Sequence, residues 1–98
     1  MAARSDLLVE ADTILDGSGH YEGDWLDSGG VTRVAVIAVS SGSGPDLRLD
    51  QGADGSTADW SPSFPASGEL PVVGRYFRLR VAGGTPNATF VATLRRLA

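Results

Sequence analysis

The 98-residue chain contains no cysteine, no lysine and a single histidine. Without cysteine it has neither disulfides nor thiolate metal ligands, and one histidine does not supply the several ligands of a zinc site. Histidine-based catalysis is restricted to His20, which we expect in a solvated loop because its segment, GSGHYEG, is rich in glycine. The sequence therefore predicts a protein without metal or cofactor, and an enzyme would need a pocket that joins His20 to carboxylates.

Long apolar segments are absent as well. The longest apolar run, Val34–Val39, has six residues, which is too short to cross a bilayer. The N-terminal residues 1–12 lack the apolar centre of a signal peptide, so we expect synthesis in the cytoplasm and no membrane contact. The net charge of −4 argues against a general nucleic-acid binder, because such proteins show a basic footprint.

What the chain does contain is thirteen glycines and five prolines that separate short apolar segments. These segments show no helical periodicity over three turns and instead predict strands. The expected strands are 7–15, 21–26, 31–40, 46–51, 57–60, 69–73, 75–81 and 88–97. About eight strands at this spacing predict one antiparallel β-sandwich domain over 1–98, jelly-roll-like, with a closed barrel as the alternative.

Two further expectations concern particular segments. Residues 31–40 are rich in valine and apolar on both faces of a strand, so we expect this strand to lie centrally between two layers. Residues 1–12, which overlap the first predicted strand, are expected to act as an N-terminal contact arm.

Arginines recur at outward positions of the predicted strands. In the segment RYFRLRV, 75–81, alternation directs Phe77, Leu79 and Val81 to the core and the intervening residues outward. Other strands place single arginines outward, and if these strands share a sheet the arginines form a basic stripe. The predicted interface residues are Arg33, Arg48, Tyr76, Arg78, Arg80 and Arg95.

Two explanations of these arginines remain open. In the first, they pair across strands with acids of the same subunit, for example Arg48 or Arg78 with Asp50. In the second, they form an interface that binds acidic loops of a neighbouring copy, since arginine and tyrosine are enriched at interfaces and a guanidinium binds carboxylates in a fork geometry.

Carboxylates and aromatic residues give the remaining candidates. The acids gather in predicted turns, where paired carboxylates can perform glycoside hydrolysis but where aspartate also simply favours a turn. The segment Asp50–Gly55 lacks the alternating ligands and distal glutamate of a calcium loop. Large aromatics are often core or interface anchors, and when exposed they stack on sugar rings. The candidates for sugar stacking are Trp25, Trp60 and Tyr76.

The order of turns and strands resembles a known group of proteins. The segments are GHYEGDWLDSG at 19–29, VTRVAV at 31–36, LRLDQGADG at 47–55 and GRYFRLRV at 74–81. Together they are similar to small β-sandwich modules of tailed-phage virion proteins, in particular capsid decoration proteins and related head or tail modules of actinobacteriophages. The resemblance covers about residues 16–81 and contains no catalytic signature.

The resemblance implies a non-enzymatic structural protein located in the virion. Such a protein binds the outer capsid surface, so the implied partner is the major capsid protein, and a homo-oligomer, preferably a trimer, is expected. The contacts would be made by the arginine face and residues 1–12. The alternative is a carbohydrate-binding or receptor-binding module of a tail or head fibre.

Overall fold

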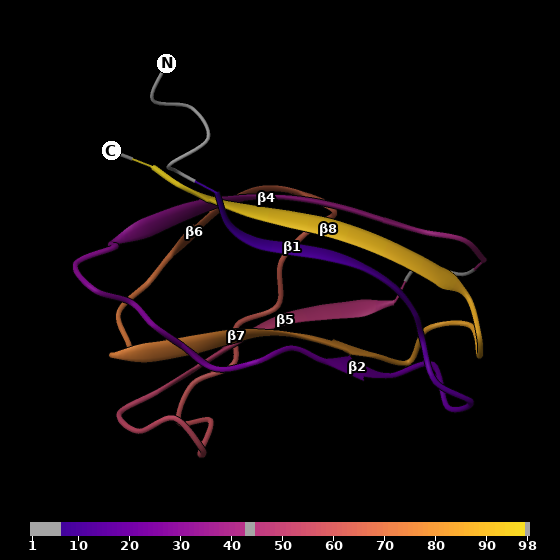
Figure 1. Cartoon of the computed structure of the whole chain (residues 1–98), viewed down its shortest axis with the longest axis horizontal. Coiled ribbons are helices and arrows are strands. Elements are labelled where there is room, and N and C mark those ends of the chain that lie inside the picture. Colours follow the sequence, from indigo (N-terminus) through magenta and orange to yellow (C-terminus); the bar gives the residue numbers. More distant parts are fainter. Residues whose placement is uncertain (1–6, 43–44, 98) are drawn as a thin grey trace.

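The computed structural model describes residues 7–42 and 45–97, which form two antiparallel sheets packed face to face (Figure 1). The first, here called the β8 sheet, has the order β1 (Leu7–Ile14), β8 (Thr89–Arg96), β4 (Arg33–Ser40) and β6 (Ser67–Pro71). In the second, the β7 sheet, the central strand β7 (Tyr76–Ala82) pairs with β5 (Asp46–Gly52), β2 (Tyr21–Glu22) and β3 (Leu26–Asp27). The predicted all-β antiparallel sandwich is confirmed.

One predicted strand, 21–26, is divided into β2 and β3, and both parts pair with β7. Glu22 lies opposite Arg80 and Leu26 opposite Phe77, so three residues of this strand face two residues of β7. One extra residue in a strand produces a bulge that interrupts the ladder. Gly23 nevertheless donates its N–H to the carbonyl of Leu79 at 2.8 Å, and the two parts continue along the same side of β7.

The core lies between the two sheets and follows the alternation that the sequence shows. In β7 the side chains of Phe77, Leu79 and Val81 are each 1% exposed. In β8 every second residue is buried as well, beginning with Phe90 and ending with Leu94. The expected inward face of 75–81 is thus confirmed, and its outward residues lie on the solvent side of the β7 sheet.

The expectation for residues 31–40 is wrong in one respect. Strand β4 is central within its own sheet, between β8 and β6, and Val34, Val36 and Ala38 are buried. Ile37 and Val39, on the opposite face, are 61% and 66% exposed. The sandwich has two layers, so an interior strand meets other residues on one face only, and the apolar residues of its second face remain uncovered.

Only part of the expected N-terminal arm can be placed. Residues 7–12 belong to β1 and pair with β8, with Glu10 opposite Thr93 and Asp12 opposite Val91. The first half of the arm, 1–6, lies outside the described residues. In the part of the chain that the structure describes, no helix has the length and apolarity to cross a membrane.

Candidate functional site

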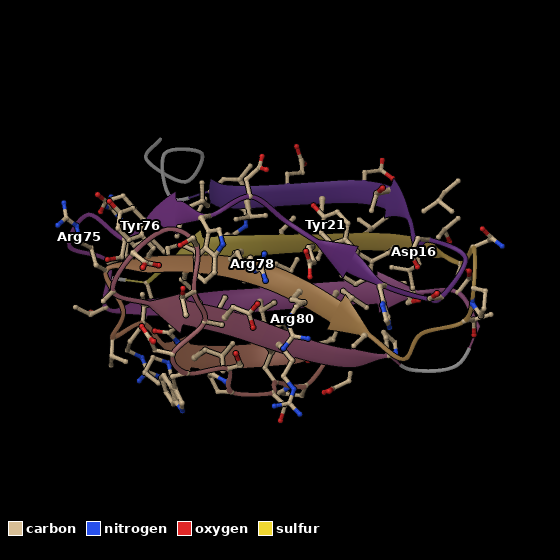
Figure 2. The ribbon with its side chains drawn as sticks, turned by 90° about the horizontal axis from the view of Figure 1, so that it is seen from below. Asp16, Tyr21, Arg75, Tyr76, Arg78 and Arg80 are labelled. Carbon is tan, nitrogen blue, oxygen red and sulfur yellow. The ribbon has the colours of Figure 1, made fainter. Side chains whose placement is uncertain are left out.

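The outward arginines are divided between the two sheets. Arg33 and Arg95 lie on the outer face of the β8 sheet, whereas Arg48, Arg78 and Arg80 lie on the outer face of the β7 sheet. Figure 2 shows Arg78 and Arg80 side by side on β7, with Arg75 and Tyr76 at one end of that face. The five arginines therefore do not form one continuous stripe.

A buried carboxylate organises the arginines of the β7 sheet. Asp50 lies on β5 directly opposite Arg78, and its side chain is fully buried. Arg78 Nε donates to Asp50 Oδ2 at 2.8 Å, and Arg80 Nε donates to both carboxylate oxygens at 2.9 and 3.0 Å. Ser61 Oγ completes the shell with a 2.7 Å hydrogen bond to Oδ1. Both oxygens of the buried acid are therefore satisfied within the chain.

The segment 59–64 provides Ser61 and covers the outer edge of β5. Its backbone pairs antiparallel with β5 through hydrogen bonds from Leu49 N to Pro62 O, 3.0 Å, and from Gln51 N to Trp60 O, 2.7 Å. The turn that brings the segment back needs glycine at 52, because a Cβ there would lie 2.1 Å from the carbonyl oxygen of Thr57. Edge covering of this kind removes unpaired strand groups from solvent.

Burial and hydrogen bonding shift the pKa of Asp50 in opposite directions. Burial raises the pKa of the carboxyl, but the hydrogen bonds from Arg80, Arg78 and Ser61, with the charge of Arg80, outweigh it and hold the pKa below its ordinary value. The group is therefore an anion at neutral pH. Arg78 also contacts Glu22 at 3.6 Å, and the Trp25 ring lies 4.8 Å from its guanidinium carbon, a distance typical of a cation–π contact.

Two of the remaining predicted interface arginines also have acids in their own chain. Arg48 Nε donates to Asp46 at 3.0 Å, and Arg33 binds Glu69 at 2.6 Å on the exposed face of the β8 sheet. Among the described residues, no carboxylate lies within salt-bridge distance of Arg95. The explanation in which arginines pair within the subunit thus accounts for four of the five, and the interface role of the set stays a prediction.

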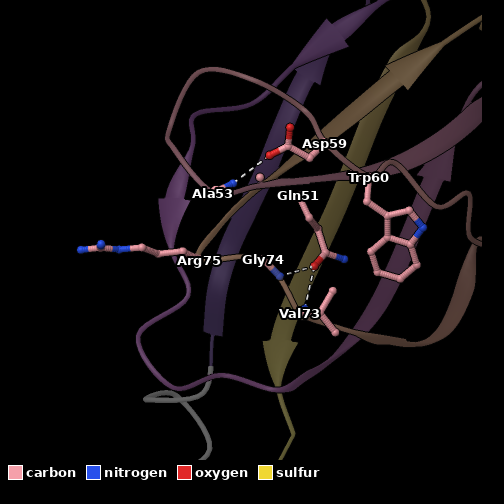
Figure 3. Close-up of a pocket in the computed structure, with 8 residues that line it drawn as sticks. Gln51, Ala53, Asp59, Trp60, Val73, Gly74 and Arg75 are labelled. Atoms are coloured by element: carbon pink, nitrogen blue, oxygen red, sulfur yellow. Dashed lines mark hydrogen bonds between the residues drawn. The ribbon is translucent and has the colours of Figure 1, made fainter.

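The aromatic candidates fall into two places. Trp25 and Tyr76 both lie against Gly55, where a Cβ would contact each of them, and Trp25 also contacts Arg78. Trp60 is 44% exposed and lines a pocket of about 390 Å³ at the end of the β7 sheet (Figure 3). The structure therefore does not combine the three predicted sugar-stacking residues in one site.

The pocket beside Trp60 has mainly apolar walls, and the polar groups around it are hydrogen-bonded within the chain. Gln51, which is 1% exposed, accepts hydrogen bonds at Oε1 from the N–H groups of Val73, 2.7 Å, and Gly74, 2.9 Å. Asp59 accepts the N–H of Ala53 at 3.0 Å. Val73 forms an apolar rim, whereas Arg75 extends away from the pocket in Figure 3. Sequence reasoning missed Gln51, for which the only signal is a polar residue next to Asp50 at the end of a predicted strand.

A second surface that the sequence did not reveal lies on the outer face of the β8 sheet. Val39 on β4 is opposite Val91 on β8, and Ile37 is opposite Thr93. Ile37 and Val39 are more than 60% exposed and Val91 is 45% exposed. We call Ile37, Val39 and Val91 the exposed stripe. It crosses the two central strands of the sheet, so it is a continuous apolar surface and differs from isolated surface residues.

A hollow on the surface lies beside the turn that contains His20. It has a volume of about 470 Å³ and is lined by Ile14, Asp16, His20, Tyr21 and Glu22. Asp16 Oδ1 accepts the backbone N–H groups of Ser18 and His20 at 2.8 and 2.9 Å, and these bonds lower the pKa of Asp16. The carboxylate therefore stabilises the turn, and no hydrogen bond joins the imidazole to an acid within residues 7–42 and 45–97.

The Asp50–Gly55 segment shows the same use of aspartate. Asp54 Oδ1 accepts the N–H groups of Ser56 and Thr57 at 2.9 and 2.8 Å, as expected for a turn. No three metal-ligating side chains gather anywhere in the described part of the chain.

Comparison with known proteins gives no relative whose role bears on this chain. No protein-family profile, curated protein or solved structure matches the chain significantly. Any function must therefore be argued from the residues and surfaces described above.

Proposed function

We propose that this chain is a non-enzymatic structural protein of a tailed-phage virion, a capsid decoration protein that binds the outer surface of the shell. The observation that carries the proposal is the exposed stripe. A contiguous apolar surface on a folded domain marks a place where another protein binds, and the centre of a protein interface is depleted of charge. The stripe has both properties, since its three members are large, aliphatic and exposed.

The jelly-roll form of the sandwich belongs to the same proposal. The β8 sheet has the order β1, β8, β4, β6, and the β7 sheet has β2 and β3 beside β7, then β5 and the segment 59–64. If β2 and β3 are counted as one interrupted strand, the chain has eight strand positions in two four-membered sheets. Jelly rolls of eight strands are common in viral capsid and lectin domains.

The charges of the β7 sheet support a structural role for its face. Three carboxylates, from Glu22, Asp46 and Asp50, lie within ion-pair distance of arginines on this face. A face whose cations are already neutralised has no electrostatic preference for phosphate, which agrees with the expectation of a protein partner. In this proposal the partner is the major capsid protein and the contacts are repeated over many copies.

The test is co-sedimentation of the purified protein with empty shells of the phage that encodes it. Wild-type protein is expected to pellet with the shells to a saturating stoichiometry. The double variant Val39→Thr/Val91→Thr, which keeps β-branching but removes apolar surface, is expected to bind less. Failure of the folded wild-type protein to pellet at any concentration would overturn the proposal.

A specific observation favours carbohydrate binding as the second candidate. Trp60 exposes its ring beside a mainly apolar pocket, with the carboxylate of Asp59 among the lining residues. Aromatic stacking with nearby hydrogen-bonding groups is how proteins hold sugar rings. On a glycan array, binding that is lost in Trp60→Ala and retained in Trp60→Phe would support it, while an array with no positive glycan would exclude it for the sugars tested.

A further inference from the structure

We infer that a second copy of this chain covers the exposed stripe, by packing the outer face of its own β8 sheet against it about a two-fold axis parallel to the strands. The inference goes beyond the proposed function, because it assigns the stripe to a second copy. The stripe would then strengthen shell binding by making the protein bivalent. The inference follows from three properties of this face: the register of its apolar residues, the position of its charges and its area.

The register makes the stripe self-complementary. The axis lies in the interface between the two copies, runs parallel to the strands and passes above the line midway between β8 and β4. It therefore places β8 of one copy over β4 of the other, at the same level along the strands. Since Val91 is opposite Val39 and Thr93 opposite Ile37 within one sheet, the axis sets Val91 on Val39 of the second copy and Thr93 on Ile37 of the second copy. Aligned packing of two sheets is a common arrangement in sandwiches, and isologous contacts are usual in dimers.

The same axis keeps the acidic β1 strands of the two copies apart. The acids of β1, Glu10 and Asp12, lie at the levels of Thr93 and Val91, and they fall over the β6 side of the second copy. The outward residue of β6 at the level of Thr93 and Ile37 is Ser67, which is neutral. The two acidic edges therefore avoid each other. Glu10 falls over a neutral residue, and Glu69, the next outward residue of β6, is already paired with Arg33.

Arg95 gains a carboxylate in this arrangement. It lies opposite Ala35 within its own sheet, and Ala35 lies opposite Glu69. The two-fold axis therefore places Arg95 over Ala35 of the second copy, next to Glu69 of the second copy, which already binds its own Arg33. In the single chain Arg95 has no carboxylate within salt-bridge distance among the described residues, so the dimer supplies one.

The area of the outer face of the β8 sheet indicates how stable a dimer we expect. Four strands about 4.8 Å apart and up to eight residues long, at about 3.3 Å each, give a face of roughly 500 Å² per copy. The total, roughly 1,000 Å², is near the lower limit for a specific protein interface. We therefore expect a reversible dimer, which differs from the trimer that the family resemblance favours.

Sedimentation velocity over about 1 to 500 μM tests the inference on the whole chain. Wild-type protein is expected to shift from monomer to dimer, and Val39→Thr/Val91→Thr to weaken the association at least about tenfold. Val73→Thr is the matched control, because Val73 is 73% exposed but lies outside the stripe, and it is expected to associate like the wild type. A monomer at all concentrations, a trimer, or an equal effect of Val73→Thr would overturn the inference.

The absence of cysteine from the sequence allows a direct test of the register. Under mild oxidation, a mixture of the single variants Val39→Cys and Val91→Cys is expected to form the mixed disulfide dimer faster than either variant forms its own. Faster formation of either homodimer would contradict the proposed axis. The folding of both variants can be checked by comparing their circular dichroism with that of the wild type.

The outcome also separates this inference from the proposed function. If the protein remains monomeric yet pellets with shells in a way that depends on the stripe, the capsid protein covers the stripe and the inference is wrong. If it dimerises through the stripe but does not bind shells, the inference stands and the decoration role fails.

Discussion

The two outer faces of this sandwich use their side chains in opposite ways. On the β7 sheet the outward residues are largely charged, and Asp50 is held by Arg78, Arg80 and Ser61 without contact with solvent. On the β8 sheet the central outward residues are Ile37, Val39 and Val91, which are exposed. The polar face is closed by its own chain, whereas the apolar face is left open.

The difference indicates where a partner is needed. Fully hydrogen-bonded ion pairs gain little from a partner, since desolvating them again costs free energy. Exposed aliphatic groups gain free energy from any surface that covers them, at about 25 cal/mol per Å². The arginines of the segment 75–81 thus lie on the outer face of the β7 sheet, while the binding surface that we propose lies on the outer face of the β8 sheet.

The largest loss of stability is expected from changes on the outer face of the β7 sheet, the closed face. The double variant Arg78→Ala/Arg80→Ala leaves Asp50 buried with Ser61 alone, and breaking a buried pair in this way costs about 3–5 kcal/mol. Urea unfolding should show this loss, and adding Asp50→Asn should recover part of it. Arg33→Ala is the control, since Arg33 is 51% exposed and exposed pairs contribute about 0–1 kcal/mol. A double variant as stable as Arg33→Ala would show that the cluster adds little to stability.

This expectation revises what the sequence predicts for the same variant. If the outward arginines form an interface, which is one of the two explanations that the sequence leaves open, loss of Arg78 and Arg80 should weaken assembly while the monomer remains folded. Because both side chains bind a buried acid, a loss of assembly in this variant would follow from unfolding and would not identify an interface. Arg95, on the open face, is the better position for that test.

Removal of the acid alone is expected to have a smaller effect. In Asp50→Asn the two arginines lose their carboxylate, but their side chains are 20% and 29% exposed and water can reach them. We expect a loss of about 2 kcal/mol in the free energy of unfolding, within the range for hydrogen bonds to charged groups. Asp46→Asn, on an exposed pair, should lose less than about 1 kcal/mol. Equal losses in the two variants would contradict the distinction between buried and exposed acids.

The pH dependence of stability follows from the lowered pKa of Asp50. The unfolded chain binds this proton more readily than the folded chain, so the contribution of Asp50 is complete above its ordinary pKa of 3.8 and is lost as pH falls through the lower folded value. Urea unfolding from pH 7 to pH 2 should show the difference between wild type and Asp50→Asn shrinking below about pH 4. A difference that stays constant to pH 2 would mean that the pKa is not lowered.

The sequence predicts the sandwich well because its strands alternate clearly and its turns are marked by glycine, proline and aspartate. Alternation also places Arg78 and Arg80 outward, and it suggests Asp50 as a partner. It does not show that the segment 59–64 folds over β5 and buries that acid, because this contact depends on a loop of irregular structure. Nor does it distinguish an apolar face covered by a third layer from one left in solvent, which is why Ile37 and Val39 were expected to be buried.

The double variant Val39→Thr/Val91→Thr in the exposed stripe is expected to have the smallest effect on monomer stability and the largest effect on association. In Val39→Thr/Val91→Thr the changed side chains are 66% and 45% exposed, and such surface substitutions usually change the free energy of unfolding by less than about 0.5 kcal/mol each. Urea unfolding at about 1 μM, where the monomer dominates, should therefore resemble that of the wild type. At about 500 μM the wild type should unfold at higher urea than the variant, because an association that stabilises only the folded state raises its apparent stability by mass action. A variant that loses stability equally at both concentrations would show that the stripe supports the monomer itself, and the contrast between a closed face and an open face would no longer hold.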